Sequence, residues 1–173
     1  MEVLELDELH WYVSHKRPAE ARQNVYLMTA VSREPRQIVG FDVAFDKSAE
    51  RIQGMIDAAP PAKTYYTDNY SAYEDVAYFG AHICGKSNTF TVESVNADLR
   101  HYIPILARRS RCFPRSLETL QAVMEVFVAA YNRFGAAKAQ FRRGRDPNAR
   151  ELPFSVLDFL WGCVCPLPTP PPP

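Results

Sequence analysis

Long hydrophobic runs are missing from this chain of 173 residues. No window approaches the roughly eighteen apolar residues that indicate a membrane-spanning helix, so the sequence predicts no membrane span. The first ten residues, MEVLELDELH, are acidic. They lack the basic start and the apolar stretch that a secretory signal needs. We therefore expect a cytoplasmic protein.

Cysteine motifs are missing as well. The chain has four cysteines, but none forms a C-x-x-C motif, and no histidine pair has zinc-finger spacing. In a cytosolic protein such cysteines are normally reduced thiols. A zinc site at Cys163 and Cys165 would need two further ligands, which the sequence does not offer.

The formal net charge is zero, but the charges are unevenly distributed. Residues 1–99 contain nine Lys and Arg against fifteen Asp and Glu, whereas residues 100–150 contain eleven against three. An acidic first part and a basic second part suit a protein that uses a metal and binds phosphate groups. An ordinary mixture of solvated faces would give the same counts, so both interpretations stay open.

The first half of the chain has the pattern of a mixed sheet. Three runs rich in strand-forming residues follow one another with short links, which predicts an antiparallel meander: Val3–Val13, Asn24–Val31 and Arg36–Phe45. A helix over Lys47–Ala58 follows, and two prolines end it. A strand, a short helix and another strand come next, and they predict a parallel pairing: Lys63–Thr67, Ser71–Ala77 and Ala81–Cys84.

The second half is predicted to be helical. The apolar spacing indicates one helix over Thr89–Ile103, with Asn88 or Thr91 as its cap, and Pro104 should end it. A longer helix over Ser116–Phe134 would begin at its Ser116 cap and end at Gly135. We expect one domain over residues 1–150, followed by an extension over residues 151–173 whose proline-rich end is unstructured.

Three acidic residues fall where the predicted elements converge. Asp7 is in the middle of the first strand, Asp68 follows the fourth strand, and Glu93 is in the first turns of the helix after the fifth strand. Carboxylates that share one cleft repel each other, and divalent cations remove that conflict. The alternative is that Asp68, at the end of a strand, serves a turn or a cap and that Glu93 lies on a solvated helix face.

Four segments together resemble the catalytic domain of transposases of the insertion-sequence-one family, which belongs to the Asp-Asp-Glu superfamily. These segments are ELDELHWYV, KTYYTDNYSAYE, HICGKSNTFTVESVNADLRHY and RCFPRSLETLQAVMEVFVAAYN, and the resemblance covers residues 3–134. The interval of 24 residues between Asp68 and Glu93 agrees with the family. The resemblance implies an α/β fold of the RNase H-like type, with a mixed five-stranded sheet flanked by helices.

The resemblance also implies roles for individual residues. Asp7, Asp68 and Glu93 would be catalytic and would hold two Mg²⁺ or Mn²⁺ ions, with Asp7 between them. The residues implied to contact DNA are Lys86, Asn96, Arg100, Arg108, Arg109 and Arg111. The arginines among them would neutralise phosphates along the DNA path. The alternative for these arginines is a solvated surface run.

The implied reaction is phosphoryl transfer on DNA without a covalent protein intermediate. A metal-activated water cleaves a strand at the element's end, and the freed 3′-hydroxyl attacks target DNA. Family members usually carry an upstream zinc and helix-turn-helix region that recognises the element's ends. Because this chain begins almost at the first strand, we expect a separate chain to supply that region, or the copy to be truncated. The expected partners are DNA at the nucleoid and further copies of the chain.

Two other functions stay open. A nuclease of the same fold would use the same carboxylates but only hydrolyse DNA. A decayed or repurposed transposase would bind DNA through the basic region of residues 100–150 without cleaving it.

Overall fold

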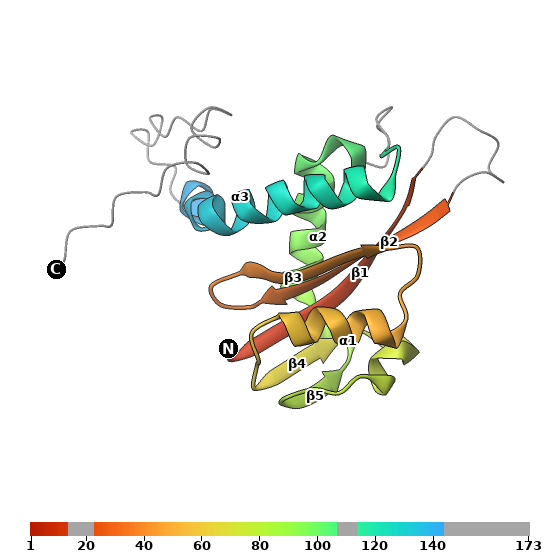
Figure 1. The fold of residues 1–173 in the computed structure, drawn as a ribbon. Helices are drawn as coiled ribbons and strands as arrows, with labels where there is room; N and C mark the ends of the chain where they lie inside the picture. The colour runs from red at the N-terminus through yellow and green to blue at the C-terminus, as the bar shows by residue number, and fades with distance from the viewer. Residues whose placement is uncertain (14–22, 107–113, 144–173) are drawn as a thin grey trace.

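The computed structural model describes residues 1–13, 23–106 and 114–143. In this part of the chain, five strands form one sheet in the order β3-β2-β1-β4-β5 (Figure 1). The strands are β1 Val3–Val13, β2 Gln23–Ser32, β3 Gln37–Ala44, β4 Thr64–Thr67 and β5 Ala81–Cys84. The first three pair antiparallel, and β4 and β5 join parallel to β1 and to each other. The predicted mixed five-stranded sheet is therefore confirmed, and it is consistent with an RNase H-like fold.

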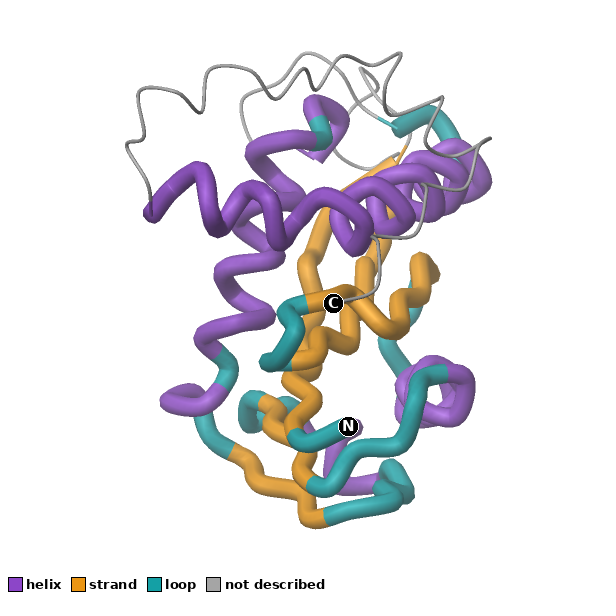
Figure 2. The backbone as a smooth tube through the Cα atoms, turned by 90° about the vertical axis from the view of Figure 1, so that its left-hand side faces the viewer, coloured by secondary structure: helices purple, strands orange, loops and turns teal. Residues whose placement is uncertain are grey.

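Helices cover both faces of this sheet. The α-helices are α1 Ala49–Ala58, α2 Phe90–Tyr102 and α3 Leu117–Arg143, and short 3-10 helices are η2 Ser71–Asp75, η3 Lys86–Asn88 and η4 Pro104–Leu106. The rotated view places α2 on one side of the strands and α1 on the other, with α3 across their upper end (Figure 2). Both α2 and α3 contribute to one hydrophobic core, and α1 contributes to the other. Among these helices, none is long and apolar enough to cross a membrane.

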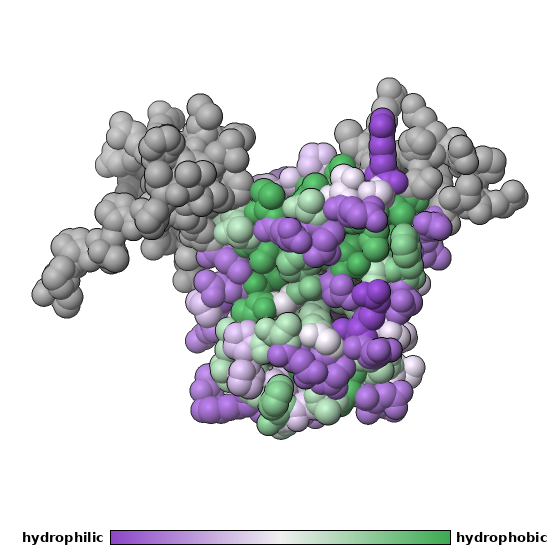
Figure 3. Space-filling view, in the orientation of Figure 1, coloured by the Kyte–Doolittle hydropathy of each residue, from purple (hydrophilic) through white to green (hydrophobic). Residues whose placement is uncertain are grey.

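Alternation along β1 builds two separate cores. Leu9, Trp11 and Val13 face the core that α2 and α3 cover. Leu4 and Leu6 face the core that α1 covers. This alternation follows from the pleat of a strand, in which successive side chains point to opposite faces. The outer surface over α1 and α3 mixes hydrophobic and hydrophilic side chains (Figure 3).

Two local predictions were wrong, and two others were confirmed, one of them with a shorter range. The short helix predicted over Ser71–Ala77 is present as a 3-10 helix that ends two residues earlier, over Ser71–Asp75. The long helix α3 continues past Gly135 to Arg143, because one glycine inside a helix costs only about 1 kcal/mol relative to alanine. Neither Asn88 nor Thr91 caps α2 with its side chain; the carboxylate of Glu5 does so from β1. The predicted cap of α3 is confirmed, since the Thr119 amide donates to Ser116 Oγ at 3.2 Å.

Candidate metal centre

The centre forms where the short strand β4 ends beside the long strand β1. β4 pairs with β1 only along Val3–Glu5, whose partners are Thr64, Tyr65 and Tyr66. Beyond that point β1 keeps its pairing with β2 but has no β4 partner. Asp68 follows the last residue of β4, so it lies beside the part of β1 that β4 leaves unpaired.

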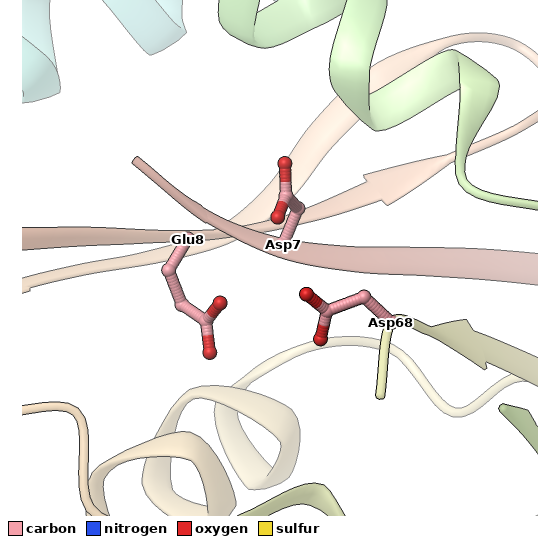
Figure 4. Close-up of side chains that lie close together, drawn as sticks. All are labelled: Asp7, Glu8 and Asp68. Carbon is pink, nitrogen blue, oxygen red and sulfur yellow. The ribbon is translucent and has the colours of Figure 1, made fainter. Parts of the chain in front are cut away.

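Three carboxylates meet at this point (Figure 4). Asp7, Glu8 and Asp68 each offer one oxygen, and these oxygens lie within 4.8 Å of one another. The sequence predicted Asp7 and Asp68 as members of the site, and the structure brings this pair together. Glu8 was not predicted, because alternation along a strand sends it to the face opposite Asp7. The missing β4 neighbour lets both side chains reach the same edge of β1.

Asp7 is held from the side of α2. Asn96 is 5% exposed, and its Nδ2 donates to Asp7 Oδ2 at 2.7 Å. The Asn96 carbonyl Oδ1 accepts a hydrogen bond of 3.4 Å from the hydroxyl of Thr29 on β2. Burial raises the pKa of Asp7, and the nearby carboxylates of Asp68 and Glu93 add to the rise, while Asn96 opposes it. The free energy of ionising Asp7 is therefore higher than in water.

Asp68 is oriented by its own loop. Its Oδ1 accepts a hydrogen bond of 2.9 Å from the backbone amide of Tyr70, two residues on. This is the local contact that Asp side chains make in turns. The Asp68 carbonyl oxygen accepts from the Thr67 hydroxyl at 3.1 Å. The loop thus leaves the other carboxylate oxygen of Asp68 available on the side of β1.

Glu8 lies on the opposite side of β1, towards α1 and η2. Its side chain is 5% exposed, and the nearest cation is Lys47, whose Nζ lies 3.9 Å from Glu8 Oε2. The buried Oε1 has no hydrogen-bond partner among the described residues. The buried Tyr73 hydroxyl interacts with Glu8 but does not reach hydrogen-bond geometry. Burial raises the pKa of Glu8 to about 7, and Lys47 only partly offsets it.

Glu93 stands close by but outside the group of three. It is exposed in the first turn of α2, and the Thr89 hydroxyl donates to its Oε1 at 3.3 Å. It is near enough to raise the pKa of Asp7. The structure therefore places Glu93 near Asp7 but outside the three carboxylates whose oxygens lie within 4.8 Å of one another.

The start of α2, and with it Glu93, is fixed by a buried carboxylate on β1. Glu5 is 0% exposed, and its Oε2 accepts the backbone amides of Thr91 at 2.7 Å and Val92 at 2.9 Å. Its Oε1 accepts from Arg33 Nε at 2.7 Å, and Arg33 Nη2 donates to the carbonyl of Asn88 at 2.9 Å. A carboxylate at a helix N-terminus satisfies free amides and complements the helix dipole.

The residues predicted to contact DNA are only partly described. Arg100 lies in the last turn of α2 and is half-buried. Lys86 begins η3, but its side chain lies outside what the structure describes. Arg108, Arg109 and Arg111 also lie outside the described residues. Asn96 is buried, and its amide contacts Asp7.

The residues present fit a hard divalent cation. Carboxylate oxygens are the ligands that Mg²⁺ and Mn²⁺ take in proteins. Three carboxylates in one partly buried place would otherwise repel each other. The unpaired, buried Oε1 of Glu8 is a further sign of a missing positive partner.

Comparison with known proteins identifies a family for this chain. A search of curated proteins found no match. The family model described as IS1 transposase matches residues 1–134, which is most of the chain. The order of the elements, the position of Asp7 and Asp68, and this match agree, and the chain belongs to the IS1 transposase family.

Proposed function

We propose that this chain is the catalytic domain of a transposase that cleaves DNA strands at the ends of a mobile element and joins the 3′-hydroxyl ends to target DNA. One observation carries the proposal: in a member of the IS1 transposase family, Asp7 and Asp68 come from distant parts of the chain and meet where β4 ends beside β1. Asp7, Asp68 and Glu93 are proposed as the catalytic metal ligands, for two Mg²⁺ or Mn²⁺ ions.

The chain's own residues prepare this site. Asn96 and the backbone of Tyr70 orient the carboxylates of Asp7 and Asp68, and the Glu5 contact fixes the helix that carries Glu93. Glu93 would complete the site by turning its exposed side chain from Thr89 towards Asp7. Divalent ions held there supply neutralisation of phosphate charge and activation of the attacking oxygen.

DNA is the proposed substrate and partner. The cationic side chains of Lys86, Arg100, Arg108, Arg109 and Arg111 are proposed to contact its phosphates. For Asn96, burial and its bond to Asp7 favour positioning of Asp7 over the DNA contact that the resemblance implied. The proposed complex that holds both element ends contains at least two copies of the chain.

The test uses DNA duplexes that carry the terminal sequences flanking the coding sequence in its genome. The full chain is incubated with these duplexes and Mg²⁺, and strand cleavage is read on a denaturing gel. Asp68→Asn should abolish cleavage and leave DNA binding intact. Asp57→Asn changes an exposed Asp on α1 in the same way and should cleave like the wild type. Cleavage that survives in Asp68→Asn would remove the metal site from the mechanism.

Two other functions are separated by a joining assay with pre-cleaved ends. A hydrolysis-only nuclease would cut but never join these ends to target DNA. A non-catalytic remnant would bind DNA, and neither Mg²⁺ nor Mn²⁺ would produce cleavage. The proposed transposase joins the ends, and its DNA affinity falls by about a thousandfold or more between low and moderate salt if several phosphates are contacted.

A further inference from the structure

We propose that Glu8 is a further ligand of the metal centre and contributes a carboxylate oxygen to the cation that Asp7 and Asp68 hold. This inference rests on the proposed function, because it concerns the same site. It adds a residue that the Asp7, Asp68 and Glu93 set does not contain. The centre would then take ligands from both faces of β1, with Asp7 on the face covered by α2 and Glu8 on the face covered by α1.

The first argument is the unmet bonding of Glu8. A buried carboxylate oxygen without a hydrogen bond is costly, and native structures rarely leave one unexplained. Glu8 Oε1 is such an atom, on a side chain that is 5% exposed. The same side chain offers an oxygen within 4.8 Å of oxygens on both Asp7 and Asp68. Figure 4 shows its carboxylate on the side of β1 where Asp68 lies.

The second argument is that Lys47 is a poor counterion for Glu8. The distance of 3.9 Å from Nζ to Oε2 is long for an ion pair that carries a hydrogen bond. Lys47 Nζ instead lies 3.6 Å from the ring centroid of Tyr70 and 5.6 Å from that of Tyr26. One such ammonium cannot neutralise three neighbouring carboxylates. A divalent cation brings the missing charge to the place where the three groups converge.

The third argument is how the fold produces the convergence. Ligands on opposite faces of a strand normally cannot share an ion, because the neighbouring strands lie between them. β4 ends at Thr67, and no β4 residue pairs with β1 beyond Glu5. The long side chain of Glu8 can therefore reach the edge that Asp7 reaches from the other face.

The experiment measures Mn²⁺ binding by calorimetry on the full chain, without DNA. The variants are Glu8→Gln, Asp68→Asn and, as an exposed control on α1, Glu50→Gln. Glu8→Gln should weaken Mn²⁺ binding by about tenfold or more. Glu50→Gln should bind like the wild type. Circular dichroism at each titration temperature establishes that every variant is folded.

Two further variants separate ligation from a structural role. Lys47→Gln and Tyr73→Phe remove the protein groups that interact with Glu8. If Glu8 served only those neighbours, both changes would weaken Mn²⁺ binding as Glu8→Gln does, and the inference would be overturned. Under our proposal Lys47→Gln binds Mn²⁺ at least as well as the wild type, because it removes a competing cation.

The outcomes for Glu8 and for the proposed function differ. Wild-type affinity in Glu8→Gln together with weak binding in Asp68→Asn would overturn the role of Glu8 and leave the metal centre standing. Wild-type affinity in Asp68→Asn would overturn the centre itself, and the role of Glu8 with it. Weak binding in both variants supports both proposals.

Discussion

The side-chain amide of Asn96 in α2 donates a hydrogen bond of 2.7 Å to Oδ2 of Asp7 in β1. This bond ties the helix that carries Glu93 to the strand that carries Asp7. It explains how a half-buried carboxylate keeps its orientation before a cation binds. Asn96 in turn receives a bond from Thr29 on the next strand, so the contact spans three elements.

Replacing Asn96 with Asp should turn this attraction into repulsion. The new carboxylate would stand against Asp7, so we expect a loss of roughly 1–3 kcal/mol in the free energy of unfolding at pH 8. The loss should shrink at pH 5, where the pair can take up a proton. Urea unfolding at both pH values measures it. Asn24→Asp, at an exposed end of β2, is the control and should change little. Equal losses at both pH values would contradict the charge explanation.

Glu5 should contribute more to stability than an exposed acid with the same ion-pair distance. Glu5→Gln weakens the cap of α2 and removes the charge opposite Arg33, and we expect a loss of about 1.5–3 kcal/mol in the free energy of unfolding. Glu2 also lies 2.7 Å from a cation, Lys63, but is exposed to solvent. Glu2→Gln should therefore have little effect on chemical denaturation. Similar losses in the two variants would show that burial does not decide the effect.

The pKa of Glu8 predicts a pH-dependent stability of the metal-free protein. The pKa is raised from 4.5 to about 7, so folding favours the protonated form. The contribution of protonated Glu8 to the free energy of unfolding is fully present below pH 4.5, and it is lost as the pH rises through about 7. Glutamine does not titrate, so Glu8→Gln keeps its stability over this range. Between pH 4.5 and pH 8 its free energy of unfolding should therefore rise, relative to that of the wild type, by on the order of 2–3 kcal/mol. Urea unfolding in the presence of a chelator measures the difference. A constant difference over this range would mean that Glu8 titrates normally.

Replacing Gly80 and Gly54 with alanine should change the stability of the protein in opposite directions. A Cβ atom on Gly80 would lie 2.5 Å from the carbonyl oxygen of Ala62, and it would also overlap the backbone of Lys63, just before β4. Gly80→Ala should therefore destabilise the protein and disturb the strand that leads to Asp68. Gly54 lies inside α1 with open space around it, so Gly54→Ala should raise the free energy of unfolding by about 0.5–1 kcal/mol. Thermal unfolding of the two variants tests both predictions. A stabilised Gly80→Ala would show that the backbone of Ala62 and Lys63, just before β4, can move to make room for the added methyl group.

Most of the fold could be predicted from the sequence because its elements are set by local patterns. Alternation of apolar residues located β1, and the 3.6-residue spacing located α1, within one or two residues of the observed bounds. Asp7 and Asp68 could be chosen because a polar residue in or just after a strand of a mixed sheet points to a site. The end of α3 was missed, since the sequence offers a glycine stop that the neighbouring helix-forming residues override.

The sequence by itself determined the order of strands and helices, the candidate acids Asp7 and Asp68, and the resemblance that led to the family. Only the tertiary structure decided that Glu8 joins them and that Glu5 caps α2. The reason is physical: alternation along a strand is local, but where a neighbouring strand stops depends on the pairing of the whole sheet. Because β4 stops at Thr67, both faces of β1 open onto one edge, and carboxylates that the pleat separates come together there.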